Sequence, residues 1–125
     1  MAIRKTIEID GVPVTFQASA ATPRLYRNMF GRDIIADMDH LVTALEGQQE
    51  GASGLDTFTL ELFENAAFTM AKQATPGIPD DVIVWLDSFE VFSIYQILPH
   101  ILELWNLNIE TLVEAKKKAL QPTES

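Results

Sequence analysis

Apolar and polar residues alternate near the N-terminus, with the period of a half-buried β-strand. The strings "TIEI" and "VPVTF" flank an Asp-Gly pair at positions 10–11. Asp-Gly between alternating apolar residues indicates a two-residue type I′ turn, because that turn needs positive φ at both positions. The pattern predicts a β-hairpin over about residues 3–18. Its apolar faces should carry Ile7 and Ile9 on the first strand, and Val12, Val14 and Phe16 on the second.

The hairpin cannot stand alone. An isolated two-stranded hairpin is marginally stable in water, so it should pack on helices or on another sheet. Pro13 lacks a backbone donor, so the second strand should be an edge, or turn that side to solvent.

After residue 20 the apolar spacing changes to three and four, which is typical of amphipathic helices. Thr22 is a suitable N-cap with Pro23 at the first helical position. Gly31 should end this helix in the left-handed conformation, and Asp33 can cap the next one. On that second helix, Asp37, Asp39 and His40 should lie off the apolar face. The apolar positions of the two helices are Leu25, Tyr26, Met29 and Phe30, then Ile34, Ile35, Met38, Leu41, Val42 and Leu45.

Further helices are predicted after a polar, glycine-rich loop at 46–54. One begins at Asp56 and ends before "TPGIPDD", residues 75–81, where another begins at Asp80 or Asp81. Asp87-Ser88 should interrupt the latter, and the next helical stretch should end near Asn106 or Asn108.

The stretch "IYQILPHILELWNLN", residues 94–108, has a proline inside an apolar helical pattern. Pro99 should kink the helix or restart it, because it removes one backbone hydrogen bond. Most of the stripe should be core, formed by Ile94, Ile97, Leu98, Ile101, Leu102 and Trp105.

The predicted fold class is therefore α+β and mainly α, with an N-terminal hairpin followed by four or five packed helices over about residues 22–108. The length of 125 residues suits a single domain, which we place at 1–115. Residues 116–125, "KKKALQPTES", should form a flexible basic and polar tail.

The charge is unevenly distributed. The net charge is −9, but residues 1–32 carry a net +3 and residues 33–115 a net −14. An acidic body argues against binding nucleic acid or an anionic membrane, because phosphate neutralisation needs clustered Lys and Arg. No apolar run approaches the ~20 residues that span a bilayer. These patterns predict a soluble protein.

Candidate chemistry is sparse. The chain has no cysteine, which excludes disulfides and thiolate zinc sites. Asp33, Asp37 and His40 share a helix face that a metal could use, although exposed polar residues explain the same spacing. His100 follows Pro99 in an apolar run and is expected to be packed or at an interface. No motif of nucleotide binding or hydrolysis is present, so we expect no enzyme activity, no cofactor and no metal.

The aromatic residues at 85–105 are the stronger signal. Aromatic side chains are enriched at protein interfaces, although they also fill small cores. In an acidic chain without catalytic motifs, their density favours protein binding. Arg27 and Arg32 could pair with the acidic body of the same or a neighbouring copy, or Arg32 could simply pair with Asp33 at the helix boundary. The candidate partner-binding residues are Trp85, Phe89, Phe92, Tyr95, Pro99, His100, Trp105, Arg27 and Arg32.

Three strings carry a resemblance to a known family: "LYRNMFGRDIIADM" at 25–38, "WLDSFEVFSIYQILPHILELWNLN" at 85–108, and the lysine-bearing tail. Over about residues 5–118 the chain resembles the tail assembly chaperones of long-tailed, siphovirus-type phages and prophages of Gram-positive bacteria. The family has a short β segment, a Tyr-Arg…Phe-Gly-Arg-Asp stretch and a Leu-Pro…Glu-Leu-Trp stretch. These motifs indicate ancestry and carry no catalytic mechanism.

The resemblance implies a non-catalytic role in virion morphogenesis. Such proteins are thought to coat the tape measure protein, keep its apolar helices soluble, and recruit tail tube protein. They act in the host bacterial cytoplasm and are absent from the mature virion. A frameshifted, longer form of the same chain is often a partner, and Lys116–Lys118 could be encoded by a slippery heptamer. Self-association is a further expectation.

A second function class stays open. The −14 segment suits an acidic phage-encoded inhibitor of the DNA-mimic type, which would bind a basic protein. Such a mimic should array its carboxylates over one exposed face, whereas here the acids interleave with apolar helix stripes.

Overall fold

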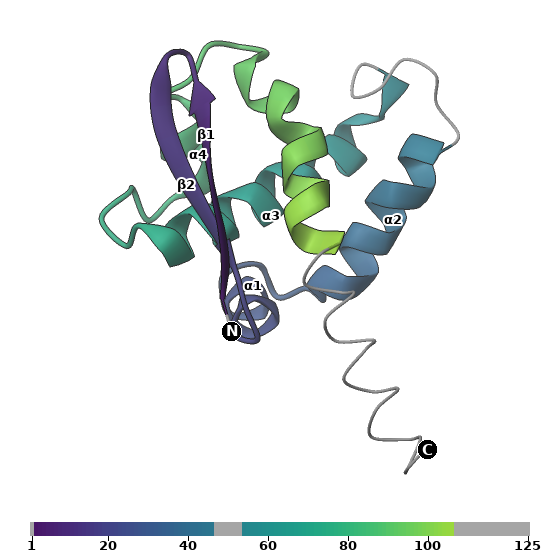
Figure 1. Ribbon diagram of the computed structural model, residues 1–125. Helices are drawn as coiled ribbons and strands as arrows, with labels where there is room; N and C mark the ends of the chain where they lie inside the picture. The colour runs from purple at the N-terminus through teal and green to yellow at the C-terminus, as the bar shows by residue number, and fades with distance from the viewer. Residues whose placement is uncertain (1, 47–53, 107–125) are drawn as a thin grey trace, which may run out of the picture.

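The chain begins with the predicted hairpin. In the computed structural model, which describes residues 2–46 and 54–106, β1 (Ile3–Ile9) pairs antiparallel with β2 (Val12–Ala18) in a two-stranded sheet (Figure 1). Asp10 and Gly11 have φ of 55° and 79°, as the predicted turn requires. Ile7 lies opposite Val14, and Ile9 lies opposite Val12. Ile7, Ile9, Phe16 and Ala18 are buried, which confirms the predicted face of β1. On β2 the prediction is only partly right, because Val14 is half-buried and Val12, next to the turn, is 58% exposed.

Pro13 lies where its missing N–H costs no ladder hydrogen bond. In an antiparallel pair, hydrogen-bonded and non-bonded positions alternate. Ile9 and Val12 flank the two-residue turn and form a bonded pair, so the next pair, Glu8 with Pro13, is non-bonded. The backbone nitrogen of Pro13 therefore points away from β1, as expected of an edge strand.

Two helices and a three-residue corner follow: α1 (Thr22–Phe30) and α2 (Ile34–Glu46). Gly31 has φ of 68°, and its N–H donates to the Arg27 carbonyl at 2.8 Å, which ends α1. The Asp33 carboxylate accepts the Ile35 N–H at 2.9 Å, as predicted for a cap. The predicted N-cap is wrong, because Thr22 is already helical. Its hydroxyl instead accepts the Ser19 N–H and donates to Gln73 on α3.

Replacing Gly31 by alanine is expected to lower the free energy of unfolding by about 1 kcal/mol. An added Cβ would meet no atom within 4 Å, so the cost is that of the left-handed backbone alone. Gly77→Ala is the matched control, because its Cβ also meets nothing and its φ is not positive. Urea unfolding of both variants measures the difference, and equal midpoints would contradict this account.

The long helix α3 (Thr57–Ala74) is the centre of the fold. The Asp56 carboxylate accepts the Thr59 N–H at 2.8 Å and caps the helix at the predicted start. The hairpin packs on α3 through β2, and α1, α2 and α4 also contact it. Figure 1 shows α3 crossing the molecule with the hairpin and α2 toward opposite sides. Ten residues of α3 are buried, among them Phe63, Phe68 and Met70.

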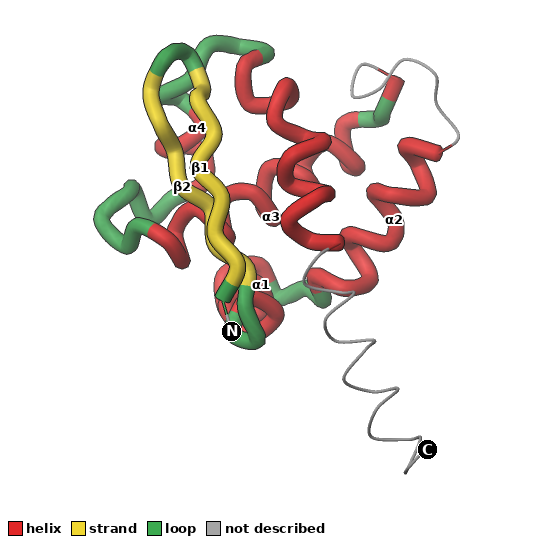
Figure 2. Tube along the Cα trace, viewed as in Figure 1, coloured by secondary structure: helices red, strands yellow, loops and turns green. Residues whose placement is uncertain are grey.

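The last part of the chain differs in detail from the prediction. After the break at 75–81, α4 (Val82–Leu86) is a short helix capped by Asp81, and Asp87-Ser88 ends it as predicted. One helix was expected from residue 90. Instead, residues 90–92 are not helical, the 3₁₀ helix η2 (Ser93–Ile97) follows, and α-helix begins only at residue 98 and continues to 106. Figure 2 shows the green loop that precedes this helical stretch.

Pro99 explains this change. It is the second residue of the segment 98–106, in a first turn whose N–H groups need no partner within that α-helix. The alternative in which Pro99 restarts the helix is therefore confirmed. The stripe is core as expected, since all its members are buried except the half-buried Leu102.

These elements form one core, which confirms an α+β, mainly α fold. Most of the predicted loop 46–54, the helix end at 108 and the tail at 116–125 lie outside the described residues. Among the described helices, none combines the length and the hydropathy needed to cross a membrane.

Candidate partner-binding surface

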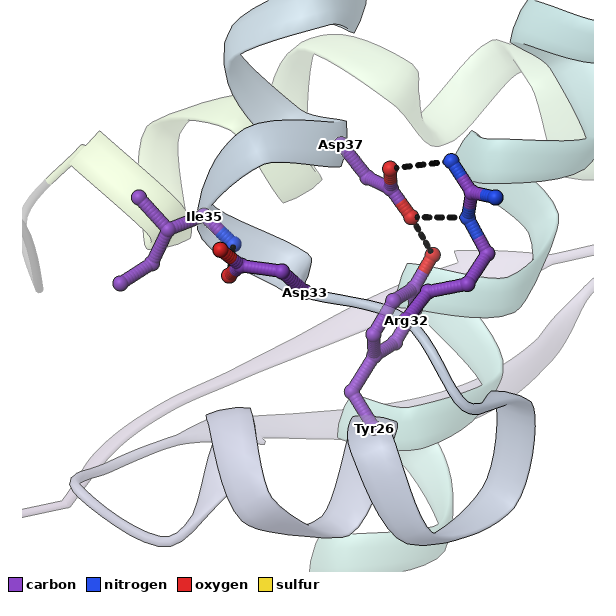
Figure 3. A network of polar contacts seen from close by, with 5 residues as sticks. All are labelled: Tyr26, Arg32, Asp33, Ile35 and Asp37. Atoms are coloured by element: carbon purple, nitrogen blue, oxygen red, sulfur yellow. Dashed lines mark hydrogen bonds and ion pairs between the residues drawn. The ribbon is translucent and has the colours of Figure 1, made fainter.

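The corner between α1 and α2, residues 31–33, carries a polar network with a structural role. Arg32 donates from Nε and Nη2 to the two carboxylate oxygens of Asp37, each at 2.8 Å, and Tyr26 Oη donates to Asp37 Oδ2 at 2.8 Å (Figure 3). Figure 3 shows Asp33 turned away from this group, toward the Ile35 nitrogen. Arg32 therefore does not pair with Asp33. It pairs with Asp37 of the same chain, and not with an acid of a neighbouring copy.

The placement of Asp37 corrects a prediction. It was expected off the apolar face of α2, but only 5% of it is exposed. Bonding to the Arg32 guanidinium lowers the pKa of the Asp37 carboxyl, against the opposing effect of burial. Burial, together with the bond to this carboxylate, raises the pKa of Tyr26. The network is partly buried, with Tyr26 and Asp37 inside and Arg32 at the surface, and it links α1 to α2.

The suggested metal stripe is not assembled. Asp37 is occupied as above, Asp33 caps α2, and the His40 ring lies against Phe58 with Nε2 3.3 Å from Thr59 Oγ1. Within residues 2–46 and 54–106, no three His, Asp or Glu side chains are arranged to hold a metal ion.

The predicted aromatic residues divide into two groups. Trp85 and Trp105 are core residues, 3% and 4% exposed. Trp85 packs on Phe68 and, edge to face, on the half-buried Phe89. Tyr95 is also half-buried, and its hydroxyl donates to Glu64 at 2.5 Å. Burial, together with this hydrogen bond, raises the pKa of Tyr95 to about 12. In this conformation the side chains of Trp85, Phe89, Tyr95 and Trp105 pack within the domain.

The other predicted partner-binding residues face solvent. Phe92 is 73% exposed, and Pro99, His100, Arg27 and Arg32 are exposed as well. Arg32 has a second contact besides Asp37, because its guanidinium carbon lies 5.4 Å from the centre of the Phe58 ring.

Phe92 belongs to an apolar surface at the hairpin tip. The Asp10 carboxylate accepts the Glu90 N–H at 3.0 Å and the Ser93 hydroxyl, so the hairpin turn holds both ends of the loop 90–93. The two residues between these contacts, Val91 and Phe92, are 77% and 73% exposed, and Val12 beside the turn is 58% exposed. We call Val12, Val91 and Phe92 the tip surface.

Short helix α4 also exposes large aliphatic side chains. Ile83 and Val84 are 68% and 56% exposed, whereas Trp85 between α4 and the core is buried. Large apolar side chains that cluster on a protein surface often mark an interaction site. Sequence reasoning found Phe92 but missed Val12, Ile83, Val84 and Val91, because their apolar character predicts burial and only the packing shows otherwise.

An open groove of about 340 Å³ lies between the end of α1 and the start of α4. Its acidic groups are already engaged: Asp80 pairs with Lys72 at 2.6 Å, and Asp81 caps α4. The groove therefore has a mixed polar and apolar lining, and its two aspartates form no acid–base pair with each other. Its lining residues are Met29, Phe30, Phe68, Asp80, Asp81 and Val82.

Comparisons with protein-family models, with curated proteins and with solved structures found no match for this chain.

Proposed function

We propose that this chain is a tail assembly chaperone of a long-tailed phage or prophage. In this role it binds apolar helical segments of the tape measure protein, keeps them soluble and recruits tail tube protein during tail morphogenesis, without catalysing a reaction. The proposal places the chain in the host cytoplasm during assembly and outside the finished virion.

The observation that carries the proposal is the tip surface. Val91 and Phe92 are more exposed than any other large apolar residues of the described chain. The Asp10 contacts hold them in place, so little ordering is needed when a partner binds. An apolar surface on a chain of net charge −9 can bind an apolar helix while the bound complex remains soluble.

The acidic residues favour this role over DNA mimicry. A mimic needs free carboxylates, but many carboxylates here accept hydrogen bonds within the chain. They cap helices, hold the hairpin tip, form ion pairs or, at Glu64, accept a tyrosine hydroxyl: Asp10, Asp33, Asp37, Asp56, Glu64, Asp80, Asp81 and Glu103.

Co-expression with the tape measure protein of the same phage tests the proposal. The wild-type chain should raise the soluble fraction of the tape measure protein and co-purify with it. Val91→Asp/Phe92→Asp should reduce this binding at least tenfold, because two charges would be desolvated at the contact. The folded state should be unaffected, since both side chains face solvent.

Ile35→Asp is the matched control. Ile35 is 47% exposed on α2, away from the tip surface, so this variant should bind as the wild type does. A tape measure protein that stays insoluble beside the wild-type chain would overturn the proposed function. If both variants lost binding to the tape measure protein equally, the tip surface would not be the binding site.

A further inference from the structure

Strand β1 has an edge that the described chain leaves unpaired. Because Ile9 and Val12 form a bonded pair beside the turn, the odd-numbered residues of β1 bond to β2. Arg4, Thr6 and Glu8 therefore direct their backbone N–H and C=O groups away from β2. Within residues 2–46 and 54–106, no hydrogen bond reaches these six backbone groups, and all three residues are exposed.

The opposite edge of the sheet is less suited to pairing. On β2, the residues whose backbone faces outward include Pro13, which has no N–H to donate. Helix packing does not distinguish the two edges, because β2 packs on α3 and β1 contacts η2. The hairpin thus has one edge blocked by proline and one edge that is a template for another strand.

The sequence of β1 is complementary to itself in antiparallel register. We propose that β1 pairs with β1 of a second copy about a two-fold axis at Thr6, which joins two hairpins into a four-stranded sheet. In this register Arg4 of each copy lies opposite Glu8 of the other, so two opposite-charge pairs form by symmetry. Ile3 lies opposite Ile9, and the exposed and buried faces of the two sheets match.

Charge and hydrogen bonding together favour a second copy as the occupant. A strand from another protein would need an acid opposite Arg4 and a base opposite Glu8 at the correct spacing, and β1 itself supplies both. The Arg4 guanidinium donates from Nε to Gln17 at 2.7 Å, which leaves its terminal amino groups for Glu8 of the second copy. The outward N–H and C=O groups of Arg4, Thr6 and Glu8 are those that this register bonds.

The pairing has a geometric consequence for the tip surface. The two β1 strands run in opposite directions, so the two hairpin turns lie at opposite ends of the joined sheet. Each turn lies about four to five residues from Thr6, so at ~3.4 Å per residue the two turns would be roughly 30 Å apart. A dimer would therefore present two tip surfaces, but the pairing itself does not depend on the proposed function.

Sedimentation velocity of the full chain over about 5–500 µM tests the pairing through the mass of the particle. The wild type should dimerise with increasing concentration. Thr6→Pro should weaken dimerisation at least tenfold, because it removes an outward N–H while sparing the bonds to β2. Thr15→Pro is the matched control on the other edge, since Thr15 lies opposite Thr6 and both changes remove the same hydroxyl contact.

Charge exchange gives a second test that does not depend on proline. Glu8→Arg or Arg4→Glu alone places like charges opposite each other twice, and each should weaken dimerisation at least tenfold. The double variant Arg4→Glu/Glu8→Arg should restore it. If Thr6→Pro does not fold, the three charge variants alone test whether β1 pairs with β1.

Three results would overturn the pairing. These are a wild-type chain that stays monomeric over the whole range, a dimer that none of these changes weakens, and a double variant that is no stronger a dimer than the single variants. All readouts use the chain alone, so they are distinct from any failure to bind a tape measure protein.

Discussion

The Phe63→Ala variant is expected to lose about 3–5 kcal/mol of its free energy of unfolding. Phe63 has no exposed surface, and its ring lies 6.2 Å from that of Tyr95, between α3 and η2. Truncation removes the contacts of the ring and leaves a cavity that the packed helices cannot fully close. Since small domains have ~5–15 kcal/mol of total stability, much of the protein should be unfolded at 37 °C.

Urea unfolding followed by circular dichroism measures this loss. Phe58→Ala is the control on the same helix, because Phe58 is 48% exposed. It should lose about 1 kcal/mol or less, which covers its contacts with Arg32 and His40. Similar losses at both positions would mean that Phe63 is not packed as described.

Removing the carboxylate of Asp37 should have the second-largest effect, about 2–3 kcal/mol for Asp37→Ala. The change leaves the buried Tyr26 hydroxyl and the Arg32 Nε and Nη2 groups without their acceptor. The loss should fall below the ~3–5 kcal/mol of a fully buried pair, because the Arg32 side chain is 44% exposed and can turn to water. Asp39→Ala, at an exposed acid on the same helix, should change stability by less than about 0.5 kcal/mol.

The same carboxylate predicts a dependence on pH. The pKa of Asp37 is lowered in the folded state from its ordinary value of 3.8, so its contribution to stability is fully present above that value. It is lost as the pH falls through the folded pKa. The stability difference between wild type and Asp37→Asn should therefore be constant near neutral pH and shrink in acid. A difference that grew with acidity would contradict the Arg32–Asp37 pair.

Local signals predicted most of the fold. The Asp10-Gly11 turn, the Gly31 helix end, the Asp33 cap and the helix start at Asp56 each depend on a few neighbouring residues, and each is found where the sequence placed it. The burial of Asp37 was not predicted, because it depends on how α1 and α2 cross. The only hint in the sequence was that Tyr26 and Arg32 precede Asp37 by eleven and five residues, so both could reach its carboxylate.

The candidate surface was harder to predict for the same reason. Trp85 and Phe92 look equally suited to a core or an interface, yet one is 3% and the other 73% exposed. What separates them is the contact between Asp10 and residues 90 and 93, eighty or more positions away. Sequence periodicity is local and carries no information about such a contact.

The long reach of the hairpin contacts also bears on the order of folding. Asp10 bonds residues 90 and 93, and Lys5 pairs with Glu103 at 2.6 Å. During synthesis the hairpin leaves the ribosome before residues 90–103, so these contacts can form only after those later residues have been made. Until then the apolar face of the hairpin, with Ile7, Ile9 and Phe16, has no complete cover, and contacts of such high sequence separation form slowly. The proposed chaperone, which would cover the apolar helices of another protein, would itself expose an apolar surface while its own chain is nascent and partly folded.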